Sequence, residues 1–228
     1  MSILAWPPAA AAPQLWACPD YLSYYPNASQ FVPRELQLFT GAQPWAHVRA
    51  AATASGGGLH LHEREVFSFN ASSARVAATF ARAHQLRLSV EAGGSMCGAP
   101  AAAAAAVLQK FGPFLAAGGV LAQYALESIF SRSVAACPEA TLAQLANHTA
   151  AYARAIHDGM LRAGAPAPEF GLIDAVPHFW VNTTRKSYPP NPAFRARYHD
   201  WSLPAVIDAL SAAMKAQSLG EQVFFVIK

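Results

Sequence analysis

The length, composition and charge of this chain favour one large folded domain and exclude several classes of protein. At 228 residues, with 54% hydrophobic and 13% charged residues, the chain is too apolar for intrinsic disorder and long enough to bury a sizeable core. Its net charge of +3 comes without a cluster of Lys and Arg, so we expect no nucleic-acid partner. Charges and prolines interrupt every long apolar run, so we expect no transmembrane segment.

The first 20 residues differ in composition from the rest of the chain. They are rich in Ala and Pro and lack the basic residues with which a secretory signal begins. We therefore expect a degenerate signal or a disordered N-terminus at residues 1–20. The remaining residues, 21–228, are expected to form one domain.

Short apolar runs and amphipathic segments alternate through that domain. The spacing of apolar residues predicts helices at residues 33–39, 44–52, 72–85, 101–117, 141–163 and 203–218. The helix at 101–117 is expected to kink or stop near Gly112 and Pro113. Short apolar runs predict strands at residues 58–62, 86–90, 120–126, 170–173 and 222–227.

Strands that alternate with helices of this length predict right-handed crossovers and a mainly parallel sheet. Neither G-x-G-x-x-G nor G-x-x-x-x-G-K-[ST] opens a predicted helix, which argues against a dinucleotide or a P-loop site. The expected fold class is therefore α/β, a parallel (β/α) barrel of the TIM type that is partial, with about five βα units.

Four of the predicted strands end in a carboxylate. These residues are Glu63, Glu91, Glu127 and Asp174. In (β/α) barrels the catalytic groups lie at the carboxyl ends of the strands, so we expect the four acids to gather around one mouth. Each acid alone has a simpler alternative role, as a hydrogen-bond partner for loop amides or for an arginine.

Three motifs in this order resemble a largely uncharacterised group of secreted glycosidase-like (β/α)8 barrels. The motifs are LSVEAGGSMCG at 88–98, AAGGVLAQYALE at 116–127 followed by a cysteine, and GLIDAVP at 171–177. The similarity covers most of residues 26–177 and implies a barrel fold and glycosidase-type carboxylates. Two acids of the family pattern are replaced here by Ser128 and Val176, while Glu127 and Asp174 match it.

Glycoside hydrolysis needs two carboxyl groups, about 5 to 5.5 Å apart for retention and about 6.5 to 9.5 Å for inversion. We predict that Glu91 and Glu127 form this pair, that Asp174 assists, and that no cofactor is required. The chain would then be a secreted, carbohydrate-active protein of glycoside hydrolase type that acts on a polysaccharide.

Other residues near the predicted strand ends are candidates for substrate binding. They are Glu63, His62, His178, Trp180, Tyr188 and Trp201. The aromatic residues would stack on sugar rings, and His178 would move protons. Packing is the simpler role for each aromatic side chain.

Two alternatives to an active glycosidase remain open. The first is a non-catalytic carbohydrate-binding or structural barrel that has lost catalytic acids. The second is a metal-dependent isomerase or hydrolase that uses His60, His62 and Glu63; no metal site is predicted, because the spacing of these residues matches no common metal motif.

Asparagine and cysteine indicate the secretory pathway. The sequence has five asparagines, and four open an N-x-S/T sequon: Asn27, Asn70, Asn147 and Asn182. Cys97 and Cys137 follow neighbouring predicted strands and can form a disulfide, which leaves Cys18 over. Since the last predicted strand is apolar, we expect a partner or further βα units to cover it.

Overall fold

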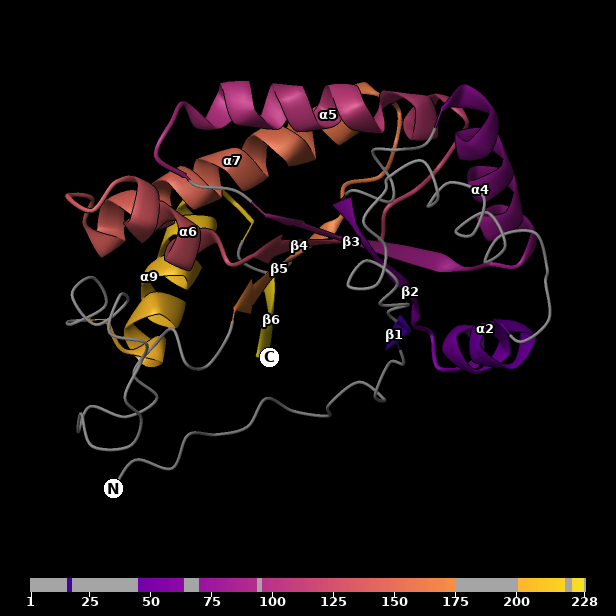
Figure 1. The fold of residues 1–228 in the computed structure, drawn as a ribbon, viewed down its shortest axis with the longest axis horizontal. Helices are drawn as coiled ribbons and strands as arrows, with labels where there is room; N and C mark the ends of the chain where they lie inside the picture. The colour runs from indigo at the N-terminus through magenta and orange to yellow at the C-terminus, as the bar shows by residue number, and fades with distance from the viewer. Residues whose placement is uncertain are drawn as a thin grey trace.

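One parallel sheet organises the protein (Figure 1). The computed structural model describes residues 16–17, 45–63, 70–93, 96–174, 201–219 and 223–227. Within them, six strands follow one another across the sheet in chain order, and every neighbouring pair is parallel. The strands are β1 (Trp16–Ala17), β2 (Gly58–His62), β3 (Arg87–Gly93), β4 (Gln123–Glu127), β5 (Glu169–Asp174) and β6 (Val223–Ile227). The α/β class and the parallel sheet are thus confirmed.

Helices connect the strands and cover the sheet. They are α2 (Trp45–Ala54), α4 (Ala71–Ala83), α5 (Pro100–Ala116), α6 (Ile129–Ala136), α7 (Leu142–Arg162) and α9 (Leu203–Ala216). The longer helices α4, α5, α7 and α9 pack side by side against one face of the sheet (Figure 1). Among the described residues, none of the helices combines the length and the apolar character that a membrane crossing requires.

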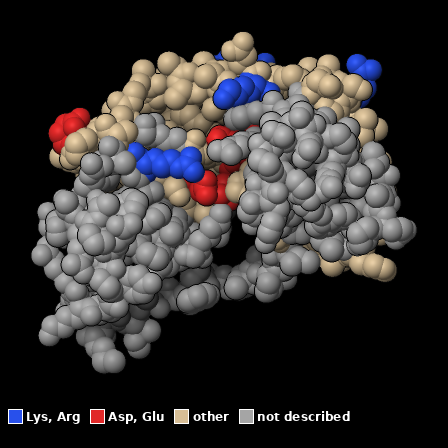
Figure 2. Space-filling view, viewed as in Figure 1, with Lys and Arg blue, Asp and Glu red and all other residues tan. Residues whose placement is uncertain are grey.

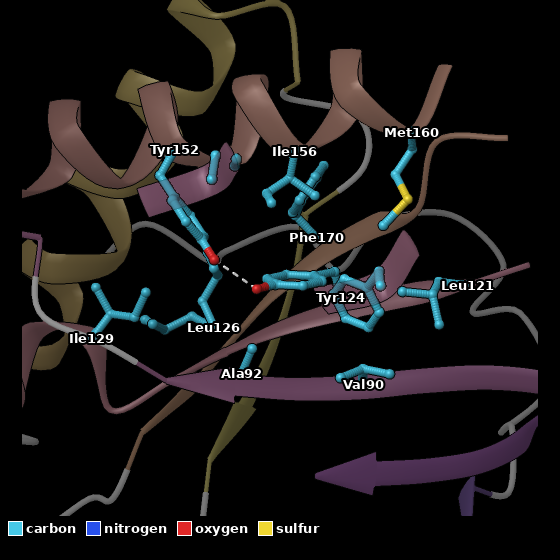
Figure 3. Close-up of a cluster of buried hydrophobic side chains, with 14 of the residues drawn as sticks. Val90, Ala92, Leu121, Tyr124, Leu126, Ile129, Tyr152, Ile156, Met160 and Phe170 are labelled. Carbon is cyan, nitrogen blue, oxygen red and sulfur yellow. Dashed lines mark hydrogen bonds between the residues drawn. The ribbon is translucent and has the colours of Figure 1, made fainter. Parts of the chain in front are cut away.

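The core fills the layer between the sheet and these helices. Strand residues alternate between the two faces of a sheet, and the residues directed toward the helices are large and apolar. On β4 and β5 they include Tyr124, Leu126 and Phe170, which pack beneath Ile156 and Met160 of α7 (Figure 3). Burying one such side chain stabilises the fold by about 1.5 to 3 kcal/mol.

Polar side chains cap the N-termini of two helices that cover this core, α4 and α7. Asn70 accepts hydrogen bonds from the backbone N–H groups of Ser72 and Ser73 at the start of α4. Thr141 and Gln144 form a reciprocal capping box at the start of α7. Each cap satisfies N–H groups that have no partner inside the helix, so these segments start where the caps occur.

Several predicted boundaries are wrong. Strand β3 continues through Glu91 to Gly93, so Glu91 lies inside the strand and not at its end. Helix α5 does not stop at Pro113, because Phe111 and Phe114 on either side of that proline are both buried in the core, and a kink there stays a prediction. The strand predicted at 120–126 begins only at Gln123.

Two elements were not predicted. Residues Trp16 and Ala17, which belong to the expected signal or disordered segment, pair with β2 as strand β1. Helix α6 is only eight residues long, too short for a clear periodic pattern. The helix predicted at 33–39 and the rest of residues 1–20 lie outside the described residues.

Candidate functional site

The sheet face directed away from the helices carries a group of polar side chains. Alternation places His60 and His62 of β2 on this face, with Ser89 and Glu91 of β3 and Glu127 of β4. We call these five residues the polar face. Acidic atoms lie near the centre of the view in Figure 2, with Lys or Arg atoms beside them.

A hydrogen-bonded chain holds the carboxylate of Glu91. His60 Nε2 lies 2.9 Å from Glu91 Oε2, and His60 Nδ1 lies 2.8 Å from the hydroxyl oxygen of Ser89. When Glu91 is ionised it only accepts, so Nε2 is then the donor and Nδ1 of the neutral ring accepts from the serine. Ser89 is buried, Glu91 is 1% exposed and His60 is 14% exposed. The carboxylate is therefore fixed in orientation and shielded from water.

His62 lies on the other side of the same carboxylate. Its Nδ1 is 3.8 Å from Glu91 Oε1, and its side chain is 25% exposed. Glu91 thus lies between two imidazoles, of which the outer one reaches solvent. At 3.8 Å the contact is an ion-pair distance and too long for a hydrogen bond, so a protonated His62 would act on Glu91 through its charge.

The second carboxylate of the polar face, Glu127, is partly exposed and paired with Arg132. The Arg132 Nη2 donates to Glu127 Oε2 at 2.9 Å. Helix α6 supplies this arginine, and its guanidinium lies directly over Gly93, where a Cβ atom would overlap it. The guanidinium is always protonated, so the ion pair places a permanent positive charge beside Glu127.

Strand register brings Glu91 and Glu127 near each other. Glu91 pairs with Ala125, and Glu127 pairs with Gly93, so the two acids are diagonal neighbours on adjacent strands. Two residues of rise and one strand spacing separate their Cα atoms by about 8 Å. Gly93 and Ala125 carry little or no side chain, and the Arg132 guanidinium occupies the space over Gly93 between the two acids.

The charge of Glu63 affects two buried tyrosines. Glu63 directly follows His62, and its charge raises the pKa of both Tyr124 and Tyr152, which are buried on the helix side of the sheet. That Glu63 shares one mouth with the other acids stays a prediction. Asp174 ends β5 beside Ile227 of β6, and its side chain lies outside the described residues.

The remaining substrate-binding candidates are only partly covered by the structure. His178, Trp180 and Tyr188 lie outside the described residues. Trp201 is partly buried and packs against the hydrophobic core next to the start of α9. These contacts agree with the simpler role for Trp201, which is packing in the core and not stacking on a sugar ring.

A disulfide links Cys97 and Cys137, with Cα atoms 5.7 Å apart. It joins the segment after β3 to the C-terminal end of α6, as the order of the strands suggested. The backbone N–H of Met96 also donates to Ser133 Oγ, at 2.7 Å, so α6 is attached to this segment at two points. Cys18 lies outside the described residues.

The described part of the chain contains no group of three His, Cys, Asp or Glu side chains suited to holding a metal ion. His60 and His62 contact the same carboxylate, Glu91, instead of converging with Glu63. The metal-dependent alternative has no support in this geometry.

Sequence reasoning missed two residues of the site, Ser89 and Arg132. Ser89 precedes Glu91 by two positions, so strand alternation was a signal that could have placed both on one face. Arg132 lies in α6, a helix that the sequence did not predict, and nothing in the linear pattern pointed to Glu127 as its partner.

Comparison of this chain with protein-family models, with curated proteins and with solved structures gives no match. The functional argument therefore depends on the geometry of the polar face.

Proposed function

We propose that this chain is a carbohydrate-active protein of glycoside hydrolase type, built as a partial (β/α) barrel. Six parallel strands in chain order, with the longer helices on one face, support the barrel proposal. The polar face then corresponds to the inside of that barrel.

The observation that carries the proposal is the placement of Glu91 and Glu127 as diagonal neighbours on adjacent strands. The Cα separation of about 8 Å is compatible with either class of glycosidase, since flexible glutamate side chains adjust the carboxyl distance. Glu127, which is partly exposed beside Arg132, would act as the nucleophile or as the base for water. Glu91 would be the proton donor in its protonated form, in which its hydroxyl group donates to His60 Nε2 and the ring proton lies on Nδ1, toward Ser89.

Hydrolysis tests this proposal directly. We would measure the release of reducing ends from a panel of polysaccharides and identify a responsive substrate. Glu127→Gln and Glu91→Gln should each lower turnover by about 100-fold or more, because a positioned acid or base contributes at least that much. Glu169→Gln, at the opposite end of the sheet, makes the same chemical change and should leave turnover intact. Equal activity in all three variants would refute the roles of the two acids.

A non-catalytic carbohydrate-binding protein is the second candidate. It is favoured by the burial of Glu91, whose two oxygens both face imidazoles. Ser128 and Val176 also occupy positions where the resembling family has acids. Affinity electrophoresis in gels that contain the same polysaccharides separates the two candidates. Binding without product, unchanged in Glu91→Gln, would favour this second candidate over hydrolysis.

We further propose that the protein passes through the secretory pathway. The disulfide and the exposed sequon residues Asn70 and Asn147 support this proposal. Both asparagines differ from the usual loop acceptor, since Asn70 caps α4 and Asn147 lies within α7. The other two, Asn27 and Asn182, lie outside the described residues. Endoglycosidase treatment of the native protein should reduce its mass, and an unchanged mass would contradict the proposal.

A further inference from the structure

We propose that a pocket beside the disulfide binds a single sugar ring, as an additional subsite of the carbohydrate-active protein proposed above. The pocket has a volume of about 200 Å³. Its walls come from the segment after β3, from the end of α6 and from the start of α7, and they include the Cys97–Cys137 disulfide. The ligand class rests on the proposed function, whereas the pocket itself does not.

His148 provides a hydrogen-bond acceptor in this pocket. Its Nδ1 lies 2.8 Å from the backbone oxygen of Met96, and both residues line the pocket. A carbonyl oxygen cannot donate, so Nδ1 carries the proton. In the neutral ring Nε2 therefore has a free lone pair, and it can accept from a ligand hydroxyl.

Gln144 is a candidate hydrogen-bond donor in this pocket. Its Oε1 accepts from the backbone N–H and from the hydroxyl of Thr141, at 2.8 and 3.0 Å. These two contacts identify the oxygen of the amide, so the other end of the side chain is the NH₂ group. Since Gln144 also lines the pocket, its NH₂ is a donor for a ligand oxygen.

The other lining residues are one acidic residue and several apolar ones. Glu139 is exposed at the rim and adds carboxylate oxygens, which only accept when ionised. Met96 and Leu145 are almost completely buried and supply apolar surface. The pocket thus offers acceptors, one donor group and an apolar wall within a small space.

The volume of the pocket and the chemistry of its lining indicate the class of ligand that it would bind. A volume of about 200 Å³ is below the range of roughly 300 to 1,000 Å³ that is typical of sites for drug-sized ligands. A ring with hydroxyl groups at its edge and C–H groups on its face fits both the volume and the lining. Only His148 and Glu139 could ligate a metal, which is too few for a metal site.

The location links this pocket to the polar face. Met96 follows the end of β3 by three residues, and β3 carries Glu91. Cys137 follows α6, and α6 carries Arg132. The hydrogen bond from Met96 to Ser133 connects these two segments, so the pocket and the carboxylates belong to one continuous structure.

Nuclear magnetic resonance can test the subsite without any turnover. We would titrate the full chain with the methyl glycosides of glucose, of N-acetylglucosamine and of glucuronic acid, and follow the ring nitrogens of His148. At least one glycoside should shift the Nε2 resonance with saturation. No shift with any of the three would overturn the proposal.

Two variants and one control locate the binding. Glu139→Ala removes an exposed side chain and should weaken binding by about tenfold, the effect of one hydrogen bond to a charged group. Ala140→Trp should fill the pocket and abolish the shift. Glu169→Ala, at the far end of the sheet, should bind normally, and equal binding by all three would refute the location. The titration of His148 requires no turnover, so it gives a result even if the hydrolase proposal fails.

Discussion

The hydroxyl groups of Tyr124 and Tyr152 lie 2.7 Å apart in the buried layer between β4 and α7 (Figure 3). Burial is the main reason that the pKa of Tyr152 is raised to about 12 and that of Tyr124 well above its usual value. The charge of Glu63 raises both pKa values further. This hydrogen bond satisfies two polar groups inside an otherwise apolar core.

Alkaline pH should therefore destabilise the protein. Above a pH of about 10 the tyrosines of the unfolded chain lose their protons, while the buried pair keeps them. The unfolded state then binds fewer protons, so the free energy of unfolding falls as the pH rises from about 10 to about 12. Tyr152 alone should account for about 2 to 3 kcal/mol of this fall, measured by urea unfolding at several pH values.

Substitution of the tyrosine pair provides the matching control. Tyr152→Phe leaves the Tyr124 hydroxyl buried without its partner and should cost about 1 to 3 kcal/mol at neutral pH. The double variant Tyr124→Phe with Tyr152→Phe should recover part of that loss and flatten the alkaline dependence. A double variant with the same alkaline profile as the wild type would contradict this explanation.

Gly93 should control the position of Arg132. A methyl group at Gly93 would overlap the Arg132 guanidinium, which must then move away from its place beside Glu127. We expect Gly93→Ala to reduce polysaccharide turnover or binding while the thermal unfolding temperature changes little, because the partly exposed ion pair contributes only about 0 to 1 kcal/mol. Gly98→Ala has open space around it and is the matched control.

The buried pair of His60 and Glu91 should contribute more to the free energy of unfolding than a similar pair at the surface. His60→Leu leaves the Glu91 carboxylate buried with one hydrogen bond fewer and should cost about 3 to 5 kcal/mol. Asp158→Asn weakens a partly exposed pair with Arg154 and His157 and should cost less than about 1 kcal/mol. Chemical denaturation of the two variants measures both values. Equal losses would show that burial does not set the strength of the His60 contact.

Loss of the disulfide should destabilise the fold without changing its topology. Cys97 and Cys137 are 40 residues apart, and closing a loop of that length stabilises the folded state by about 4 kcal/mol in the chain-entropy model. Cys97→Ser with Cys137→Ser should lower the unfolding temperature by the same amount as a reductant lowers it in the wild type. Cys18→Ser should retain the sensitivity to reductant. If Cys18→Ser abolished that sensitivity, a different pairing would be responsible.

Most of the secondary structure could be predicted from sequence because its signals are local. Periodic apolar residues, the polar residues that cap α4 and α7, and short apolar runs lie within one element each. They predicted five of the six helices that the described residues form, each within two residues of its observed ends. Alternation of strands and helices also predicted the parallel sheet. The elements that the sequence did not predict, α6 and β1, are short, and too few residues establish a pattern in them.

The linear sequence by itself determined the α/β class, the parallel sheet and the acidic residues from which a site could be built. Only the tertiary structure decided which of these acids share a face. Strand β3 continues past Glu91, and strand register places Gly93 opposite Glu127. Those facts put Glu91 and Glu127 together. The physical reason is that side chains alternate with a period of two, so a shift of one residue in a strand boundary moves a carboxylate from the polar face to the core.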